Sequence, residues 1–366
     1  MTSLTAHASS LTNLTAPPSL RVAASADTAR WTNAGWTGAR TASHNMGRQQ
    51  RQLTVLTDDG TRLACTDYGD PAAPHTVVFL HGLCLNSTSW TQHITRLTRR
   101  YGPAVRIITY DHRGHGHSAA APASSYTINR LAADLSDVLR ALRVHGPLTL
   151  VGHSMGGMTA LAYLDQPTHQ RPVEPTGLIL IATAAGKLTQ HGLGRLLAAP
   201  GAATLLHRAA QAADNLLRTL VKPMCTLLSH LGDHLAATTL ASVTLNALTT
   251  TPPHTALGFL PALRTYNVHP TLPRISARTV IISGDLDPLT PAEHSRDLAA
   301  AIPGAHHINV AGAGHMLPQQ APDVIHRAIT ATVTAASQRQ PTALSRPLTL
   351  QPNSIPVPSA AGFAAV

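Results

Sequence analysis

The sequence of 366 residues predicts an α/β fold, in which a mainly parallel sheet of eight strands is flanked by helices and interrupted by an inserted helical cap. Three observations predict this fold. Short apolar runs alternate with amphipathic segments, as in chains that pass repeatedly from strand to helix. In several runs the β-branched and aliphatic residues are nearly continuous, which is typical of strands covered on both faces. A long Leu-rich segment lies between the apolar runs that end at 182 and begin at 278.

The expected strands begin with a hairpin around Asp59-Gly60, because that dipeptide suits a tight turn between the alternating stretches LTVLT and TRLACTDYG. Six further strands are expected along the chain, at 76–82, 105–111, 148–154, 176–182, 278–284 and 306–311. Helices are expected at 127–145, 290–301 and 317–335. In the first of these helices, apolar residues recur at helical spacing and form one face, at Leu131, Leu135, Val138, Leu139 and Leu142.

The chain divides into a core in two parts, a cap and two tails. The Leu-rich segment is too long for a simple crossover and has helical periodicity, so we expect a helical cap over 186–270. The core would then comprise 53–185 and 271–337. The leader, 1–52, and the Pro-rich tail, 338–366, lack an apolar period, so both are expected to be disordered.

Charge and composition argue against several classes of protein. The formal net charge is +10, but the two tails carry +6 of it and no Lys/Arg run exceeds Arg99-Arg100, so we expect no nucleic-acid partner. The sequence contains no run of about 18 apolar residues, so no membrane span is expected. Three cysteines without CxxC spacing and a start without a secretory apolar region lead us to expect a cytoplasmic protein. A targeting function of the Ser/Thr/Arg-rich leader stays open.

A candidate nucleophile, Ser154, lies at the end of the strand expected at 148–154. The chain reads LTLVGHSMGG and then continues into the helical stretch MTALAYL. Glycines two residues before and after Ser154 permit a sharp reversal from strand to helix, where Cβ atoms would collide. A hydroxyl is a poor nucleophile until a base removes its proton, so a histidine and an orienting carboxylate are expected downstream.

Both groups occur in the expected order, each at the carboxyl end of a strand. The segment SGDLDPLTP follows one strand and supplies Asp287, and AGAGHMLP follows the next and supplies His315. Open parallel sheets gather their active sites at that edge. We therefore assign His315 as the general base and Asp287 as its orienting carboxylate, with Asp285 as the rival carboxylate.

Attack by the serine on a carbonyl group would form a negatively charged oxygen, an oxyanion, which hydrogen-bond donors must stabilise. The segment LHGLC comes directly after a strand, and its glycine lets the backbone approach a ligand closely, so the backbone N–H groups of Leu83 and Met155 are the expected donors. His112, His115 and His117 lie close together in the sequence, but no carboxylate or thiolate set accompanies them at a recognised metal spacing. We therefore expect no metal site there and interpret the segment as a braced turn.

Five segments resemble the α/β-hydrolase superfamily, in the branch of capped esterases, haloperoxidase-like proteins and carbon–carbon bond hydrolases. They are HGLCLNSTSW, YDHRGHGHS, VGHSMGG, GDLDPLTP and GAGHMLP, in the order of that family and within about 53–337. The resemblance implies an α/β-hydrolase fold with Ser154, Asp287 and His315 as nucleophile, acid and base. It also implies that Leu83 and Met155 form the oxyanion hole, and its Gly-x-x-Asp spacing favours Asp287 over Asp285.

The sequence thus predicts a serine hydrolase, a carboxylesterase that cleaves an ester of apolar character through an acyl-enzyme, without cofactor or metal. The Leu-rich cap with few charges favours a small apolar substrate. Thioester hydrolysis, carbon–carbon bond cleavage and cofactor-free perhydrolysis would use the same triad, so they remain alternatives. A further alternative is a ligand-binding protein that keeps the fold without catalysis. The oligomeric state is not predicted.

Overall fold

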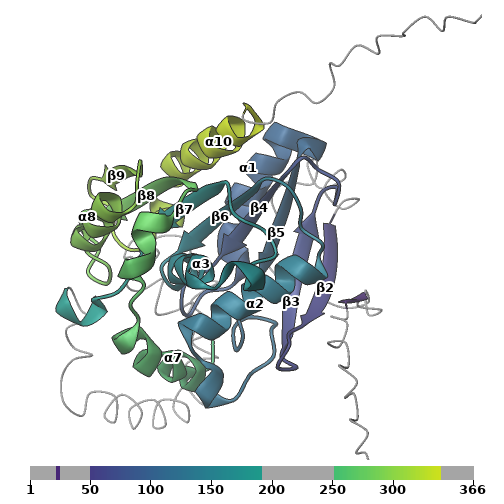
Figure 1. Ribbon diagram of the computed structural model, residues 1–366, viewed down its shortest axis with the longest axis horizontal. Coiled ribbons are helices and arrows are strands. Elements are labelled where there is room, and N and C mark those ends of the chain that lie inside the picture. Colours follow the sequence, from purple (N-terminus) through teal and green to yellow (C-terminus); the bar gives the residue numbers. More distant parts are fainter. Residues whose placement is uncertain (1–21, 25–49, 192–250, 339–366) are drawn as a thin grey trace, which may run out of the picture.

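The computed structural model describes residues 22–24, 50–191 and 251–338 (Figure 1). The predicted fold class is confirmed, because eight strands form one mainly parallel sheet between two layers of helices. A ninth strand, β1 (Val22–Ala24), pairs with the sheet edge and falls within the expected leader. Most of the expected cap, at 192–250, and of the two expected tails lies outside the described residues.

The sheet has the order β1-β2-β3-β5-β4-β6-β7-β8-β9. The eight expected strands are β2 (Gln50–Leu56), β3 (Arg62–Tyr68), β4 (His75–Leu80), β5 (Val105–Tyr110), β6 (Leu148–His153), β7 (Gly177–Ile181), β8 (Arg278–Gly284) and β9 (His306–Val310). Strands β2 and β3 form the expected hairpin, in which Gly60 takes a positive φ of 82° between antiparallel partners. From β5 to β9 every pair of neighbours is parallel.

Helices cover both faces of the sheet because the central strands are buried on both sides (Figure 1). One face packs against three helices, α2 (Ile128–Ala141), α3 (Met155–Asp165) and α8 (Ala292–Ala301). Helix α7 (Pro253–Thr265) packs against α2 and contributes to the same apolar cluster. The other face packs against α1 (Thr91–Tyr101) and α10 (Pro322–Gln338), whose apolar residues include Leu97 and Ile329. The packing on each face removes apolar side chains from water. Each Å² of apolar surface buried in this way stabilises the fold by about 25 cal/mol.

The helix expected over 317–335 is two helices. A short helix α9 (Leu317–Gln320) ends before Ala321, and α10 begins at Pro322. The ring of a proline disfavours helical backbone at the preceding residue, and Ala321 accordingly has φ −132° and ψ 51°. The break separates the short helix that follows His315 from the long helix that packs on the sheet.

The sheet order brings distant segments of the sequence to one edge. β4 and β6 are neighbours, β7 follows β6, and β8 and β9 complete this side of the sheet. The segments that follow β4, β6, β8 and β9 carry the sequence-predicted site residues. Because all four strands are parallel, these segments leave the sheet at the same edge.

Candidate active site

Ser154 occupies a strained turn between β6 and α3. Its φ of 53° and ψ of −119° lie in a region that residues with a side chain rarely adopt. Its backbone N–H donates to the carbonyl of Ile181 at 2.9 Å, which holds the turn against β7. The turn needs its glycines, because a Cβ on Gly152 would lie 2.6 Å from the carbonyl carbon of Gly156, and one on Gly156 would overlap the carbonyl of Leu80. The predicted strand–turn–helix geometry is therefore present.

The imidazole of His315 is paired with the carboxylate of Asp287. His315 Nδ1 lies 2.8 Å from Asp287 Oδ2, and both side chains are buried. A carboxylate only accepts hydrogen bonds, so this contact places a proton on Nδ1 and leaves Nε2 as the nitrogen that can take a proton. This is the arrangement of a general base with its orienting acid.

Further hydrogen bonds hold Asp287 in the ionised state. The backbone N–H groups of Leu289 and Thr290 donate to Oδ1 at 2.8 and 3.0 Å, and the Thr290 hydroxyl donates to Oδ2 at 2.8 Å. Burial alone would raise the pKa of Asp287, but the hydrogen bonds from His315 and Thr290 outweigh it and lower the pKa below its usual value. Thr290 was not identified from the sequence, although a hydroxyl three residues after a carboxylate is a common local hydrogen-bond partner.

Asp285, the rival carboxylate, has a different role. Its Oδ1 accepts the backbone N–H of Gly312 at 2.7 Å, so it ties the end of β8 to the loop after β9. Between the two candidates, the structure pairs Asp287 with His315.

The segment that carries His315 is also tied to the strand that carries Ser154. His153, the residue before Ser154, donates from Nε2 to the carbonyl of His315 at 2.9 Å, and the two imidazole centroids are 5.1 Å apart. Within the described residues no hydrogen bond joins Ser154 to the His315 ring. Nucleophile–base contacts are often longer in unliganded enzymes than during the reaction.

The segment after β4 lies against Ser154. A Cβ built on Gly82 would approach Ser154 Cβ to 3.2 Å, so any side chain at this position would crowd Ser154. Leu83 follows it and is half-buried. Met155 is the first residue of α3, where a backbone N–H has no acceptor inside the helix. The two predicted oxyanion donors therefore belong to segments that flank Ser154 on two sides.

His81 fixes the peptide unit that contains the Leu83 N–H. Its Nδ1 lies 2.8 Å from the Gly82 carbonyl, and its Nε2 accepts the backbone N–H of His112 at 2.9 Å. His81 Nδ1 therefore carries the proton and donates it to that carbonyl. In a trans peptide the N–H points opposite to the C=O, so the Leu83 N–H is directed away from His81.

Two histidines of the expected braced turn take part in this packing. His112 Nε2 lies 3.1 Å from the His81 carbonyl, and His115 Nε2 accepts the backbone N–H of Cys84 at 3.3 Å. Burial lowers the pKa of His115 to about 3, so its ring is neutral at pH 7. His117 is exposed and lies beside Asp111. Within the described residues no group of three or more His, Cys, Asp or Glu side chains is placed to hold a metal ion.

Comparison with known proteins identifies the family. The family model described as "alpha/beta hydrolase fold" matches residues 75–322, which include every predicted site residue. The chain belongs to the α/β-hydrolase family.

Relatives of this α/β-hydrolase include several named enzymes. A magnesium-chelatase 30 kDa subunit from Rhodobacter capsulatus is 30% identical over 69% of this chain and 84% of its own length. A 3-oxoadipate enol-lactonase from Acinetobacter baylyi is 29% identical over 65% of this chain and 80% of its own. An esterase structure from Exiguobacterium antarcticum has the same fold, with TM-score 0.59 and 23% identity, over 77% of this chain and 98% of the esterase. Hydrolases among these relatives support an enzyme of the α/β-hydrolase type.

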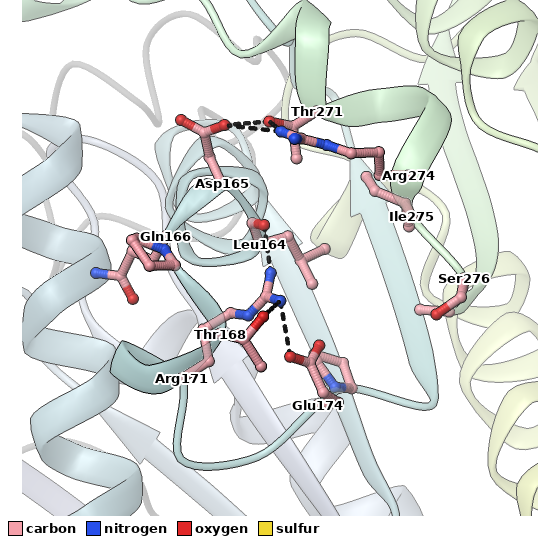
Figure 2. Close-up of a pocket in the computed structure, with 13 residues that line it drawn as sticks. Leu164, Asp165, Gln166, Thr168, Arg171, Glu174, Thr271, Arg274, Ile275 and Ser276 are labelled. Atoms are coloured by element: carbon pink, nitrogen blue, oxygen red, sulfur yellow. Dashed lines mark hydrogen bonds and ion pairs between the residues drawn. The ribbon is translucent and has the colours of Figure 1, made fainter.

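A separate cavity of about 590 Å³ lies at the far end of α3 in this α/β-hydrolase (Figure 2). Polar side chains in its wall are already paired with one another. Arg171 Nη2 is 2.8 Å from Glu174 Oε1, and the hydroxyl of Thr271 donates to Asp165. None of the predicted catalytic residues lines this cavity. None of the described helices has the length and apolar character that crossing a bilayer requires.

Proposed function

We propose that this α/β-hydrolase is a serine hydrolase that cleaves a carboxylic ester of apolar character through an acyl-enzyme. The observation that carries the proposal is the pairing of His315 with Asp287 at 2.8 Å, in a segment hydrogen-bonded to the residue before the strained Ser154. A ligand-binding protein would have no chemical need for a buried imidazole held by an ionised carboxylate beside a strained serine.

In the proposed reaction the hydroxyl of Ser154 attacks the ester carbonyl carbon while His315 Nε2 takes its proton. Asp287 stabilises the imidazolium that forms, and the backbone N–H groups of Leu83 and Met155 receive the negative oxygen of the tetrahedral intermediate. His315 then protonates the departing alcohol as its bond to carbon breaks. Water, deprotonated by His315, attacks the acyl-enzyme and releases the acid. Side chains, backbone amides and water supply every group in this scheme.

The ester substrate is supported by the relatives. Among them are a 3-oxoadipate enol-lactonase and several esterases, and a lactone is an internal ester. Proteins named as non-heme chloroperoxidases also match, over about 30% of this chain. The same three side chains could act on thioesters, on carbon–carbon bonds or in peracid formation, so a panel of substrates distinguishes these reactions.

The test combines active-site labelling with substrate profiling. A fluorophosphonate probe should label the wild-type protein, and p-nitrophenyl esters from acetate to palmitate, with a parallel acyl-CoA series, should show the preferred acyl group. Ser154→Ala should abolish labelling and lower kcat about a millionfold. Ser124→Ala, at an exposed serine in a short 3₁₀ helix, is the matched control and should retain both. Wild-type protein that neither takes the label nor turns over any ester would overturn the proposal and favour a binding protein.

A further inference from the structure

His153 lies where the nucleophile, the base and the oxyanion segment meet. It is the last residue of β6, directly before Ser154, and 1% of its surface is exposed. Its Nε2 is 2.9 Å from the carbonyl of His315. Its Nδ1 faces Gly82, where an added Cβ would come within 3.1 Å of it. One buried ring at the end of β6 thus lies beside the segments that follow β4 and β9.

The hydrogen bond to His315 determines the protonation state of this ring. A carbonyl oxygen only accepts, so the proton lies on Nε2. Nδ1 is buried and has no hydrogen-bond partner within the described residues. Burial and the neighbouring His315 lower the pKa of His153 to about 3. The ring is therefore a neutral donor at pH 7.

We propose that His153 is a positioning residue, which sets where the imidazole of His315 stands relative to the Ser154 hydroxyl. The inference rests on the function proposed above. Asp287 restrains the side chain of His315 by its hydrogen bond to Nδ1. His153 restrains the backbone of the same residue, because its Nε2–H holds the His315 carbonyl. Side-chain and backbone restraints together fix the ring, whereas either one alone leaves a degree of freedom.

The consequence is catalytic because the reacting atoms must meet within narrow limits. A displacement of about 1 Å in a catalytic group can lower a rate about a hundredfold. Loss of the His153 donor also leaves the His315 carbonyl without that hydrogen bond in a buried place, so the segment has reason to move. The expected loss is in kcat, since His153 is placed to act on the base and has no assigned contact with a substrate.

Two substitutions separate positioning from mere filling of space. The amide nitrogen of a glutamine is as many bonds from Cβ as Nε2 of histidine, so His153→Gln keeps a donor near the same place. His153→Met fills a similar volume without a donor, and flexible methionine is well tolerated in cores. We expect His153→Gln to keep most of the wild-type kcat, and His153→Met to lose about a hundredfold in kcat with little change in KM.

A double-mutant cycle completes the test. If His153 acts through His315, then His153→Met in a His315→Ala background should cost almost nothing further. His145→Met, at an exposed site before the other end of β6, should keep full activity. Thermal unfolding of every variant reports whether it is folded.

The outcomes separate the two proposals. Wild-type kcat in a folded His153→Met variant would overturn the positioning role alone. Equal losses of kcat in the Gln and Met variants, or additive losses in the cycle, would also overturn that role. A wild-type protein without ester turnover would overturn the proposed function, and the positioning role of His153 with it.

Discussion

His315 Nδ1 lies 2.8 Å from Oδ2 of Asp287, although 27 residues separate them in the sequence. The same carboxylate accepts three further hydrogen bonds, from the N–H of Leu289 and from the N–H and hydroxyl of Thr290. A carboxylate held by so many donors keeps its orientation and its charge. Both properties are what an imidazole base requires from its partner, because the wrong tautomer would leave no lone pair for the nucleophile.

The first prediction concerns the choice between two neighbouring carboxylates. Asp287→Asn keeps the size of the side chain but favours the wrong His315 tautomer, so kcat for a p-nitrophenyl ester should fall about ten-thousandfold. Asp285→Asn is the matched control. Its partner is the backbone N–H of Gly312, so kcat should change less than about tenfold. Equal losses in the two variants would contradict the assignment of the acid.

Much of the fold and site could be predicted because both depend on local patterns. Continuous apolar runs predict buried strands, and the glycines around Ser154 predict a sharp turn, since each reflects a constraint within a few residues. The contacts of His153 and His81 could not be predicted in this way. They depend on which strands become neighbours in the sheet, and a chain with 22 histidines gives no sign of which of them will be buried together. The choice of Asp287 needed a family spacing for the same reason.

The second prediction concerns the close approach of the β4 segment to the nucleophile. In Gly82→Ala the new Cβ would lie 3.1 Å from His153 Nδ1 and 3.2 Å from Ser154 Cβ, so the Gly82 segment and these neighbours must move apart by a few tenths of an ångström. That shift moves the Leu83 N–H, and loss of one oxyanion donor costs about 3 kcal/mol of barrier. We expect kcat to fall at least about tenfold.

Gly304→Ala serves as the contrasting variant for this prediction. Gly304 has a positive φ of 67° but open space around its Cα, and it lies in the turn before β9. Alanine there should lower Tm through backbone strain while kcat is retained. A Gly82→Ala variant with wild-type kcat would show that the segment does not contribute to the oxyanion hole.

The third prediction follows from histidines that burial keeps neutral. Burial lowers the pKa of His75 and His93 to about 4, and of His115 and His153 to about 3, against an ordinary value of 6.5. Below pH 6.5 the unfolded chain binds protons that the folded chain does not. Stability is therefore fully present above pH 6.5 and falls as the pH drops towards 4, by up to about 1.4 kcal/mol per pH unit for each such group.

Urea unfolding at pH 7.5, 6.5 and 5.5 measures this dependence. His75→Gln keeps an amide that can hydrogen-bond to the Thr149 hydroxyl, which lies 2.9 Å from His75 Nε2, but it removes the titrating ring. The variant should therefore show a slope smaller by about one proton between pH 6.5 and 5.5. Ser124→Ala, at an exposed residue that does not titrate, should leave the slope as in the wild type. An unchanged slope in His75→Gln would contradict the assignment of a neutral buried ring.

The fourth prediction concerns Arg113, a residue of the turn after β5, whose side chain binds Asp134 of helix α2. Its Nε and Nη2 donate to both carboxylate oxygens of Asp134 at 2.8 and 2.6 Å, and its Nη1 is 2.8 Å from Asp59 Oδ2. Arg113 and Asp134 have no exposed side-chain surface. Burial raises the pKa of Asp134, and the two ion-pair partners, Arg113 and Arg130, act against that rise. Arg113→Met should therefore cost about 3 kcal/mol in the free energy of unfolding, because it leaves a buried carboxylate with only its weaker partner.

The surface pair Arg96–Asp323 offers a control for that cost. Their side chains are 35% and 71% exposed, so solvent screens the pair and Arg96→Met should leave the urea midpoint nearly unchanged. Removing both buried charges, as in Arg113→Met with Asp134→Leu, should recover part of the loss, since the penalty comes from the carboxylate that remains. Urea unfolding at pH 7.5 measures all three variants. If Arg113→Met costs no more than Arg96→Met, the buried pair does not hold the turn to α2. The His112 and His115 segment would then be braced by its other hydrogen bonds, which include those that Asp111 accepts.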